Sequence, residues 1–207
     1  MPTGYEQIYI GLLPQLATCD IVGHAKNLGL NTNDDGSVSI NFLTHRYLIT
    51  NQGVEQVDGR DPVHINDRSL VIHYILSEGG IEPKLSFVPI GRLSGVMEGH
   101  DDENWFICDA LLRESKGKYD VFAAAAEAMG GTYEGKLMSG HSWQFLVFPK
   151  MPMRLLYFEP DEEFPAEVQV QYDETAPFYM DFECLAFLST SLGRGLCEII
   201  QQQKAER

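Results

Sequence analysis

The sequence has few cysteines, and their spacing excludes the usual zinc and iron–sulfur patterns. The four thiols, with no CxxC pair among them, are those of Cys19, Cys108, Cys184 and Cys197. No HxxxH or HExxH spacing occurs, which argues against a zinc site on one helix. We therefore predict free thiols that pack as small hydrophobes in a reduced, cytoplasmic setting.

The chain is also poor in cationic side chains. Fifteen Lys and Arg residues stand against thirty Asp and Glu residues, which gives a formal net charge of −15. Each contact with a phosphate backbone needs a cation to displace counterions, so binding to nucleic acid is not expected. Anionic membrane surfaces are disfavoured for the same reason. The charge favours solubility, and it is compatible with a basic ligand, a cationic partner or a divalent metal.

Long hydrophobic runs and common catalytic signatures are missing as well. No apolar run approaches the ~20 residues that a membrane helix needs, and residues 1–16 do not have the cationic start of a signal peptide. The chain has no GxGxxG and no P-loop, and GRLSG at residues 91–95 fails the GxSxG spacing. Ser139-Gly140-His141-Ser142 is suggestive only by composition, and we predict a glycine-containing loop there.

What the sequence does contain is the pattern of a single α+β domain. The hydrophobic fraction of 44% and the aromatic fraction of 11% are those of a globular chain. A unit of this length buries about 70–75% of its unfolded-chain surface, so it needs no disulfides to fold. We predict one domain over residues 1–207, an antiparallel sheet flanked by helices. Residues 1–60 would supply two helices and a small β-meander, and residues 61–207 the main body.

In the N-terminal part, helical spacing at residues 5–13 ends or kinks at Pro14. Asp20 and Gly29 suit the two caps of a second helix. Alternating apolar residues then predict strands at 38–42 and 47–50, and a short third strand at 54–57. A break follows at 59–62.

In the main body, Asn66 or Asp67 would cap a helix with a buried apolar face. The face consists of Leu70, Val71, Tyr74 and Ile75. Residues 85–90 predict a strand that Pro89 confines to an edge or a strand end, and residues 91–104 a loop. Residues 105–112 fit a helix and a strand equally, residues 119–129 a helix, and residues 143–148 a strand. The last helix, 181–203, has a core stripe of Leu185, Leu188, Leu192, Leu196 and Ile199. Gly193 and Gly195 weaken it, and they permit close packing or a kink.

The most distinctive stretch is residues 148–173. It combines four prolines, an apolar run at 153–158 and the acidic cluster Asp161-Glu162-Glu163. The residues after it alternate, so that Val168, Val170 and Tyr172 share one face and the glutamines between them the other. We predict two strands joined by an acidic turn, the second with one solvated face.

The acidic turn is the first candidate site. Oxygen-rich clusters suit Mg²⁺ or Ca²⁺, so Asp161, Glu162 and Glu163 are candidate metal or ligand-binding residues. Three consecutive carboxylates point in different directions, and Asp173 or Glu174 across the hairpin would have to complete the site. The alternative is a solvated turn whose carboxylates cap a nearby backbone end.

The second candidate is His73, beside the apolar face of its helix, with its neighbour Tyr74. Imidazole titrates near neutrality, so His73 would act as a ligand or general base at the edge of the core. The alternative is a core-edge histidine that is hydrogen-bonded to backbone.

Several short motifs point to one family. They are Phe148-Pro149-Lys150-Met151-Pro152, residues 161–166, Tyr172-Asp173, Glu183, residues 71–76, Phe87, Arg92-Leu93, Gly130-Gly131 and the hairpin at 38–49. Together they resemble a bacterial and archaeal family, domain of unknown function 3786, over most of the chain. The resemblance implies no established activity. Some relatives look like fusions to cysteine-rich iron–sulfur modules of anaerobic one-carbon metabolism, and because this chain has no cysteine cluster, it would supply the other half of that partnership.

We therefore expect a cytoplasmic accessory or binding module that acts with an iron–sulfur or one-carbon enzyme and carries no cofactor of its own. One alternative is a divalent-metal enzyme with carboxylate ligands from the acidic turn and His73 as base. The other is an oligomeric structural protein, which would associate through residues 168–172 if they form an edge strand.

Overall fold

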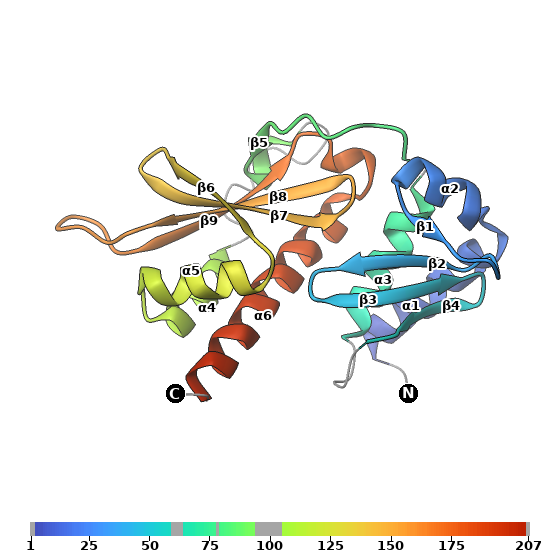
Figure 1. The fold of residues 1–207 in the computed structure, drawn as a ribbon, viewed down its shortest axis with the longest axis horizontal. Helices are drawn as coiled ribbons and strands as arrows, with labels where there is room; N and C mark the ends of the chain where they lie inside the picture. Colours follow the sequence, from blue (N-terminus) through green and yellow to red (C-terminus); the bar gives the residue numbers. More distant parts are fainter. Residues whose placement is uncertain (1–2, 59–63, 78, 94–104, 206–207) are drawn as a thin grey trace.

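The computed structural model describes residues 3–58, 64–77, 79–93 and 105–205. Within these residues the chain forms six α-helices and two antiparallel sheets, which is the predicted α+β class (Figure 1). The predicted break at 59–62 and most of the predicted loop at 91–104 lie outside the described residues.

The first helix, α1 (Gly4–Thr18), continues past Pro14, which lies inside it. Its N-terminus is closed by a capping box at Thr3. A proline inside a helix removes one backbone hydrogen bond. Leu12 and Leu16 are buried on either side of Pro14, and their packing holds the helix in place.

The second helix, α2 (Ile21–Leu28), has the predicted caps. The Asp20 carboxylate accepts from the Gly23 N–H at 3.0 Å, and Gly29 follows the helix with a left-handed φ of 72°. Local sequence alone explains both ends.

The first sheet packs its apolar face against these two helices and a third, α3 (Ile65–Leu76). Its strands, in spatial order, are β1 (Asn31–Thr32), β2 (Val38–Phe42), β3 (His45–Thr50) and β4 (Gly53–Gln56). Ile40 lies opposite Tyr47, and both side chains are buried. This is the predicted meander, preceded by one further short strand.

α3 (Ile65–Leu76) begins earlier than predicted, and its cap differs. Asn66 and Asp67 were the expected caps, whereas the N-cap is His64, whose side chain makes no capping hydrogen bond. Asp67 is buried in the first turn, where it pairs with Arg194 of the last helix. Two charge-assisted hydrogen bonds from a guanidinium stabilise a buried carboxylate more than one backbone N–H does.

The second sheet contains most of the distinctive stretch. Its strands, in spatial order, are β5 (Phe87–Val88), β9 (Glu167–Asp173), β8 (Met151–Phe158), β7 (Gly140–Phe148) and β6 (Thr132–Leu137). The strand predicted at 85–90 shortens to two residues, because Pro89 has no N–H for the ladder and a 3-10 turn, Ile90–Arg92, follows it. β6 was not predicted: most of its residues are exposed, and Gly135 sits at a bulge in its pairing with β7.

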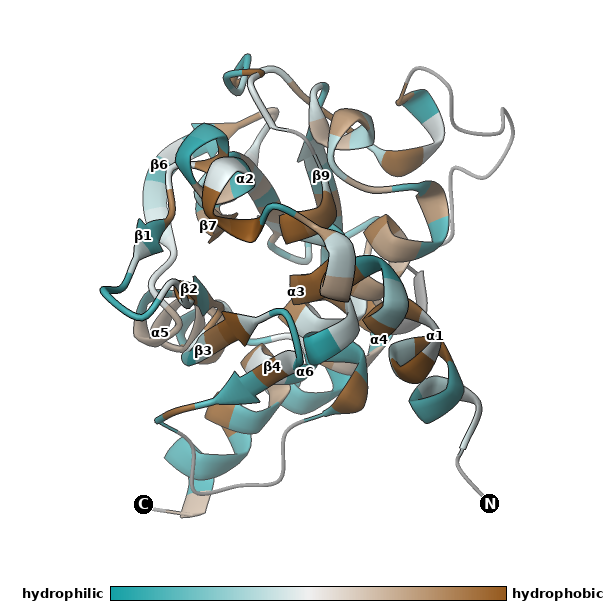
Figure 2. Cartoon of the chain, turned by 90° about the vertical axis from the view of Figure 1, so that its right-hand side faces the viewer, coloured by the Kyte–Doolittle hydropathy of each residue, from teal (hydrophilic) through white to brown (hydrophobic). Residues whose placement is uncertain are grey.

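Helices cover one face of this sheet (Figure 1). They are α4 (Trp105–Ser115), α5 (Tyr119–Ala128) and α6 (Phe182–Ala205), with a short 3-10 turn, Ala176–Phe178, ahead of α6. α6 contacts α4, α5 and also α3. It therefore joins the part of the chain that carries the first sheet to the part that carries the second. Figure 2 shows hydrophobic residues on α3, β3 and β7 in the middle of the molecule and hydrophilic residues on β1.

Two details of the predicted faces were wrong. The core stripe of α6 ends at Ile200, four residues after Leu196, and Ile199 is only half-buried. On β9, Gln169 is half-buried as expected for a solvated face, but Gln171 is only 5% exposed. The side-chain amide N–H of Gln171 donates to the side-chain Oε1 of Gln169 at 2.9 Å, which satisfies part of its hydrogen-bonding capacity away from water.

The two glycines in the middle of α6 differ in their surroundings. A Cβ at Gly193 would lie 2.0 Å from Ile107 Cγ2, close to the backbone of α4. A Cβ at Gly195 would lie 2.5 Å from the terminal methyl of Met129, which can rotate away. The predicted close packing is thus real at Gly193.

We expect Gly193→Ala to lower the free energy of unfolding by about 1–3 kcal/mol, because helices α4 and α6 must move apart. Gly195→Ala is the matched control. It should be neutral or slightly stabilising, since alanine is favoured over glycine in a helix by about 1 kcal/mol. Urea unfolding of both variants measures this, and equal effects of the two would contradict the packing argument.

Candidate functional site

The acidic turn lies at the tip of the β8–β9 hairpin and is solvated. The Asp161 carboxylate accepts from the backbone N–H groups of Glu163 and Phe164 at 2.8 and 2.7 Å. These two bonds hold the pKa of Asp161 below its usual range, and the bond from Phe164 has the larger effect. Glu162 and Glu163 are exposed. Asp161 therefore fits the alternative to a metal site that the sequence left open: its carboxylate caps a nearby backbone end.

A second turn lies beside the acidic one. The β6–β7 turn at residues 137–140 and the β8–β9 turn at residues 158–167 are at the same end of the second sheet (Figure 1). We refer to residues 136–140 and 158–167 as the hairpin end. Each turn exposes one large apolar side chain: Met138 is 70% exposed and Phe164 66%. A Cβ on Gly140 would lie 2.8 Å from the Phe158 ring, so the two hairpins are in close contact.

A hydrogen-bonded chain of side chains lies at the same end of the sheet. His141 on β7 is only 7% exposed. Its Nε2 is 2.9 Å from the Glu159 carboxylate, and its Nδ1 is 3.0 Å from the Tyr133 hydroxyl. A carboxylate only accepts, so Nε2 carries a hydrogen; in the neutral imidazole Nδ1 then accepts from the phenol O–H. The hydrogen bond with His141 lowers the pKa of Glu159 most, and Lys136 lowers it further.

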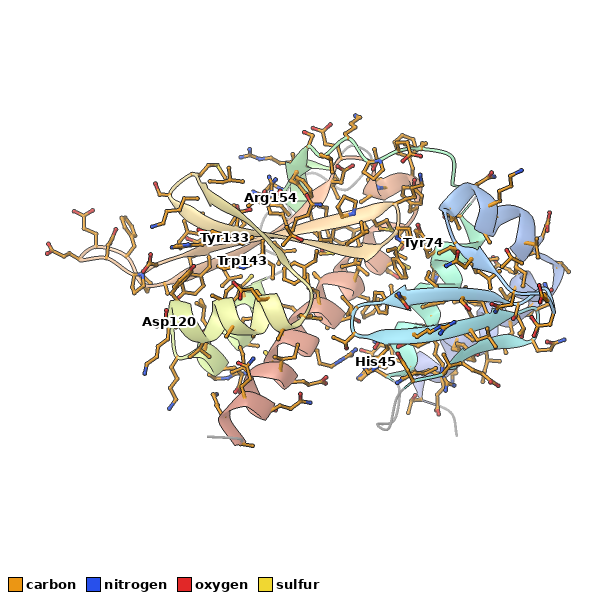
Figure 3. All side chains as sticks on the ribbon, in the orientation of Figure 1. His45, Tyr74, Asp120, Tyr133, Trp143 and Arg154 are labelled. Atoms are coloured by element: carbon orange, nitrogen blue, oxygen red, sulfur yellow. The ribbon has the colours of Figure 1, made fainter. Side chains whose placement is uncertain are left out.

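Aromatic rings surround this histidine and fill the space behind it. The Tyr119 ring lies 4.1 Å from the imidazole, centroid to centroid. The buried Trp143 ring contacts Tyr133 at 5.2 Å and Phe122 at 5.3 Å. Figure 3 shows Tyr133 and Trp143 together on the second sheet. Burial raises the pKa of Tyr119, and the neighbouring Tyr133 adds to the shift. Because the aromatic rings pack closely around it, the imidazole is held in one orientation.

Asp173 lies at the opposite end of β9, about 20 Å along the strand from the acidic turn. It is fully buried, and its Oδ1 accepts from the Lys84 N–H and from the N–H and hydroxyl of Thr175. Glu174 pairs with Lys84. The structure does not bring Asp173 or Glu174 to the acidic turn.

His73 and Tyr74 have different surroundings. His73 lines a small pocket of about 220 Å³ between α1, α3 and α6, together with Asp181 and Cys184. Burial lowers the pKa of His73, and Asp181 opposes that shift. Tyr74 is fully buried, stacks on Phe148 at 4.3 Å and accepts from a backbone N–H. Neither residue lies near the acidic turn.

A second pocket, of about 610 Å³, lies between β3, β4, the start of α3 and the C-terminal half of α6. The ion pair of Asp67 and Arg194, with N–O distances of 2.7 and 2.8 Å, lines it. The Ser191 hydroxyl also donates to Asp67 at 2.7 Å. The buried Tyr47 hydroxyl has no hydrogen-bond partner among the described residues. The pocket is polar enough to bind a small molecule, but each of its charged groups is already paired.

Sequence reasoning missed the association of His141, Glu159 and Tyr133. His141 was seen only within a loop-like tetrapeptide, whereas the structure places it inside β7. The spacing of His141 and Trp143, two residues apart, was a signal that both face the same side of a strand. Glu159 directly after β8 was a second signal. Among the described residues, no three His, Cys, Asp or Glu side chains form a group that could hold a metal ion.

The fold is that of a two-sheet α+β protein, and the site at its hairpin end combines a solvated acidic surface with a buried histidine. A family model described as a domain of unknown function (DUF3786) matches residues 20–194. The chain belongs to that family. No curated protein and no solved structure matches it. None of the helices in the described ranges has the length and apolar character needed to span a bilayer.

The buried tyrosines Tyr47 and Tyr74 allow a test of the hydrogen bonding assigned to their hydroxyls. Burial raises the pKa of both Tyr47 and Tyr74. Their stabilising effect is therefore complete below the unfolded pKa of about 10 and is lost as the pH rises above it. We expect Tyr47→Phe to be neutral or stabilising, because the hydroxyl that it removes has no described partner. Tyr74→Phe should cost about 1 kcal/mol, because the Lys150 N–H loses its acceptor.

Urea unfolding at neutral pH and near pH 11 measures both effects. Each variant should also lose less stability than the parent on the step to high pH. Equal costs for the two variants at neutral pH would contradict the assignment of the Tyr47 hydroxyl as unpartnered.

Proposed function

We propose that this chain is an accessory module that binds a protein partner through the hairpin end of its second sheet. The observation that carries the proposal is the exposure of Met138 and Phe164 on neighbouring turns within an acidic surface. Interfaces have this composition: apolar anchors at the centre and polar groups at the rim. The partner is a protein with an apolar pocket and a basic rim.

The geometry of the hairpin end supports a preformed binding surface. Asp161 accepts two backbone hydrogen bonds within its turn, and Met138 and Ser139 have φ values of 49° and 70°. Left-handed φ at both positions is the geometry of a tight hairpin turn, but it is costly for residues other than glycine. A rigid turn that presents a methionine loses little entropy on binding.

The charge of the hairpin end supports a cationic partner. Residues 158–167 carry five carboxylates, Glu159, Asp161, Glu162, Glu163 and Glu167, whereas residues 136–140 carry one cation, Lys136. Such a surface steers a basic partner and repels an acidic one. Following the sequence motifs shared with the family, we propose an iron–sulfur or one-carbon enzyme in the cytoplasm as this partner.

Site-specific photocrosslinking in the native host tests the proposal. A benzoylphenylalanine at position 164 should capture an iron–sulfur or one-carbon enzyme, whereas the same residue at position 57 should not. Val57 is about half exposed and directly follows β4 of the other sheet, so it is a matched control. Capture of the same proteins from both positions would contradict the proposal.

With the captured partner purified, Phe164→Ser should weaken binding about 30-fold, the value of about 2 kcal/mol expected for a central apolar anchor. Phe178→Ser removes an equally exposed phenylalanine from the 3-10 turn before α6 and should leave the affinity unchanged. Calorimetry at two salt concentrations would show weaker binding at the higher one. Equal effects of both substitutions would place the interface elsewhere.

A further inference from the structure

Glu159, His141 and Tyr133 form a hydrogen-bonded chain of well-defined geometry, and His141 and Tyr133 lie outside the turns proposed to bind the partner. The carboxylate is 2.9 Å from one imidazole nitrogen, and the phenol oxygen is 3.0 Å from the other. The imidazole is almost completely buried, while the Tyr133 side chain on the sheet edge is 44% exposed. A buried base thus contacts the hydroxyl of a residue that is itself partly exposed to solvent.

A hydroxyl, an imidazole and a carboxylate in this order form the arrangement that activates a nucleophile. The base lies within hydrogen-bond distance of the hydroxyl, and a third group orients the base. The carboxylate stabilises the imidazolium that forms when the base takes the proton. A phenol, with an ordinary pKa of about 10, gives up its proton more readily than an aliphatic hydroxyl does.

We propose that Tyr133 is a nucleophile that accepts an acyl group from an activated ester or thioester. The Tyr133 oxygen attacks the acyl carbon and forms a new C–O bond, while its proton moves to His141 Nδ1. The bond between the acyl carbon and the leaving oxygen or sulfur breaks. His141 returns the proton to the leaving group, so the products are an O-acyl tyrosine and an alcohol or thiol.

The surroundings favour an acyl group over a phosphoryl group. Glu159 is in the site itself, and the acidic turn is two residues further along the chain. Lys136, whose ammonium is 3.5 Å from Glu159, is a cation beside the site. Because the carboxylates outnumber this one cation, the surface would repel a phosphate dianion, whereas an uncharged ester carbonyl is not repelled.

Tyr119 keeps the base in position. Its ring is 4.1 Å from the imidazole, which leaves the histidine little freedom to rotate. Trp143 packs against Tyr133 and limits the phenol ring in the same way. Preorganisation of this kind lowers the entropy that must be lost when the proton moves.

The test uses the whole chain and p-nitrophenyl acetate. Release of p-nitrophenolate should show a burst of one equivalent, and peptide mass spectrometry should find the acetyl group on Tyr133. Tyr5, on α1, is exposed to a similar extent and serves as the internal control. General base assistance contributes about 10²–10⁴-fold, so Tyr133 should be acetylated at least about tenfold faster than Tyr5.

Tyr133→Phe keeps the ring in its packing against Trp143 and should abolish the burst. His141→Gln should reduce the rate to that of Tyr5. Glu159 acts through His141 as a positioning residue: Glu159→Gln should lower the rate, because the imidazole loses the carboxylate that accepts from its Nε2, and Glu159→Asp, which keeps a carboxylate, should restore part of it. The same thermal unfolding midpoint for parent and variants shows that the fold is intact.

Acetylation of Tyr133 at the rate of Tyr5 would overturn the proposal. So would a burst that survives His141→Gln, or equal rates for the parent, Glu159→Gln and Glu159→Asp. The proposal does not depend on the protein partner: loss of binding in Phe164→Ser with a normal burst would separate the two.

Discussion

The contact of α6 with both parts of the chain is the constraint on which the rest of the structure depends. Two consecutive residues of this helix contact two different helices. Gly193 has no side chain, so Ile107 of α4 can pack against the helix backbone. Arg194 pairs with the buried Asp67 of α3. Removing one partner of such a pair leaves an unpaired buried charge, which typically costs several kcal/mol. The ion pair therefore fixes how α6, which packs with the helices of the second sheet, meets α3, which packs on the first sheet.

The hairpin end is placed by that arrangement. With α4, α5 and α6 on one face of the second sheet, the β8–β9 turn extends beyond the helices (Figure 1), and both turns expose an apolar side chain. Apolar and acidic side chains gather on the turns, and His141 lies just inside the sheet. A surface for a partner and a base for proton transfer thus occupy one end of one sheet. Their closeness follows from strand register, because His141 pairs with Tyr157 and Glu159 follows two residues later.

Local patterns in the sequence determined the elements and several of their ends. The caps of α2 at Asp20 and Gly29 need only neighbouring residues, and so does the turn bonded to Asp161. Alternation identified β2, β3 and β9, and the apolar stripe identified α6. Periodicity did not decide residues 105–112, because a short apolar run suits a helix and a strand equally. Their packing against α6 decides it, as α4.

The failures share one physical cause, which is contact between residues far apart in sequence. Asp67 is a good N-cap by local rules, but its partner Arg194 is 127 residues away. Gln171 looks solvated on its strand but is buried in the fold. The acidic turn and His73 were joined in one hypothetical metal site, and they lie in different parts of the molecule, whereas His141, Glu159 and Tyr133 were unconnected in the sequence and meet in the structure. The sequence by itself thus determined the α+β class, the family and most elements, since these depend on local periodicity and short motifs. Only the tertiary structure decided which charges and hydroxyls meet, because strand register and helix packing are long-range.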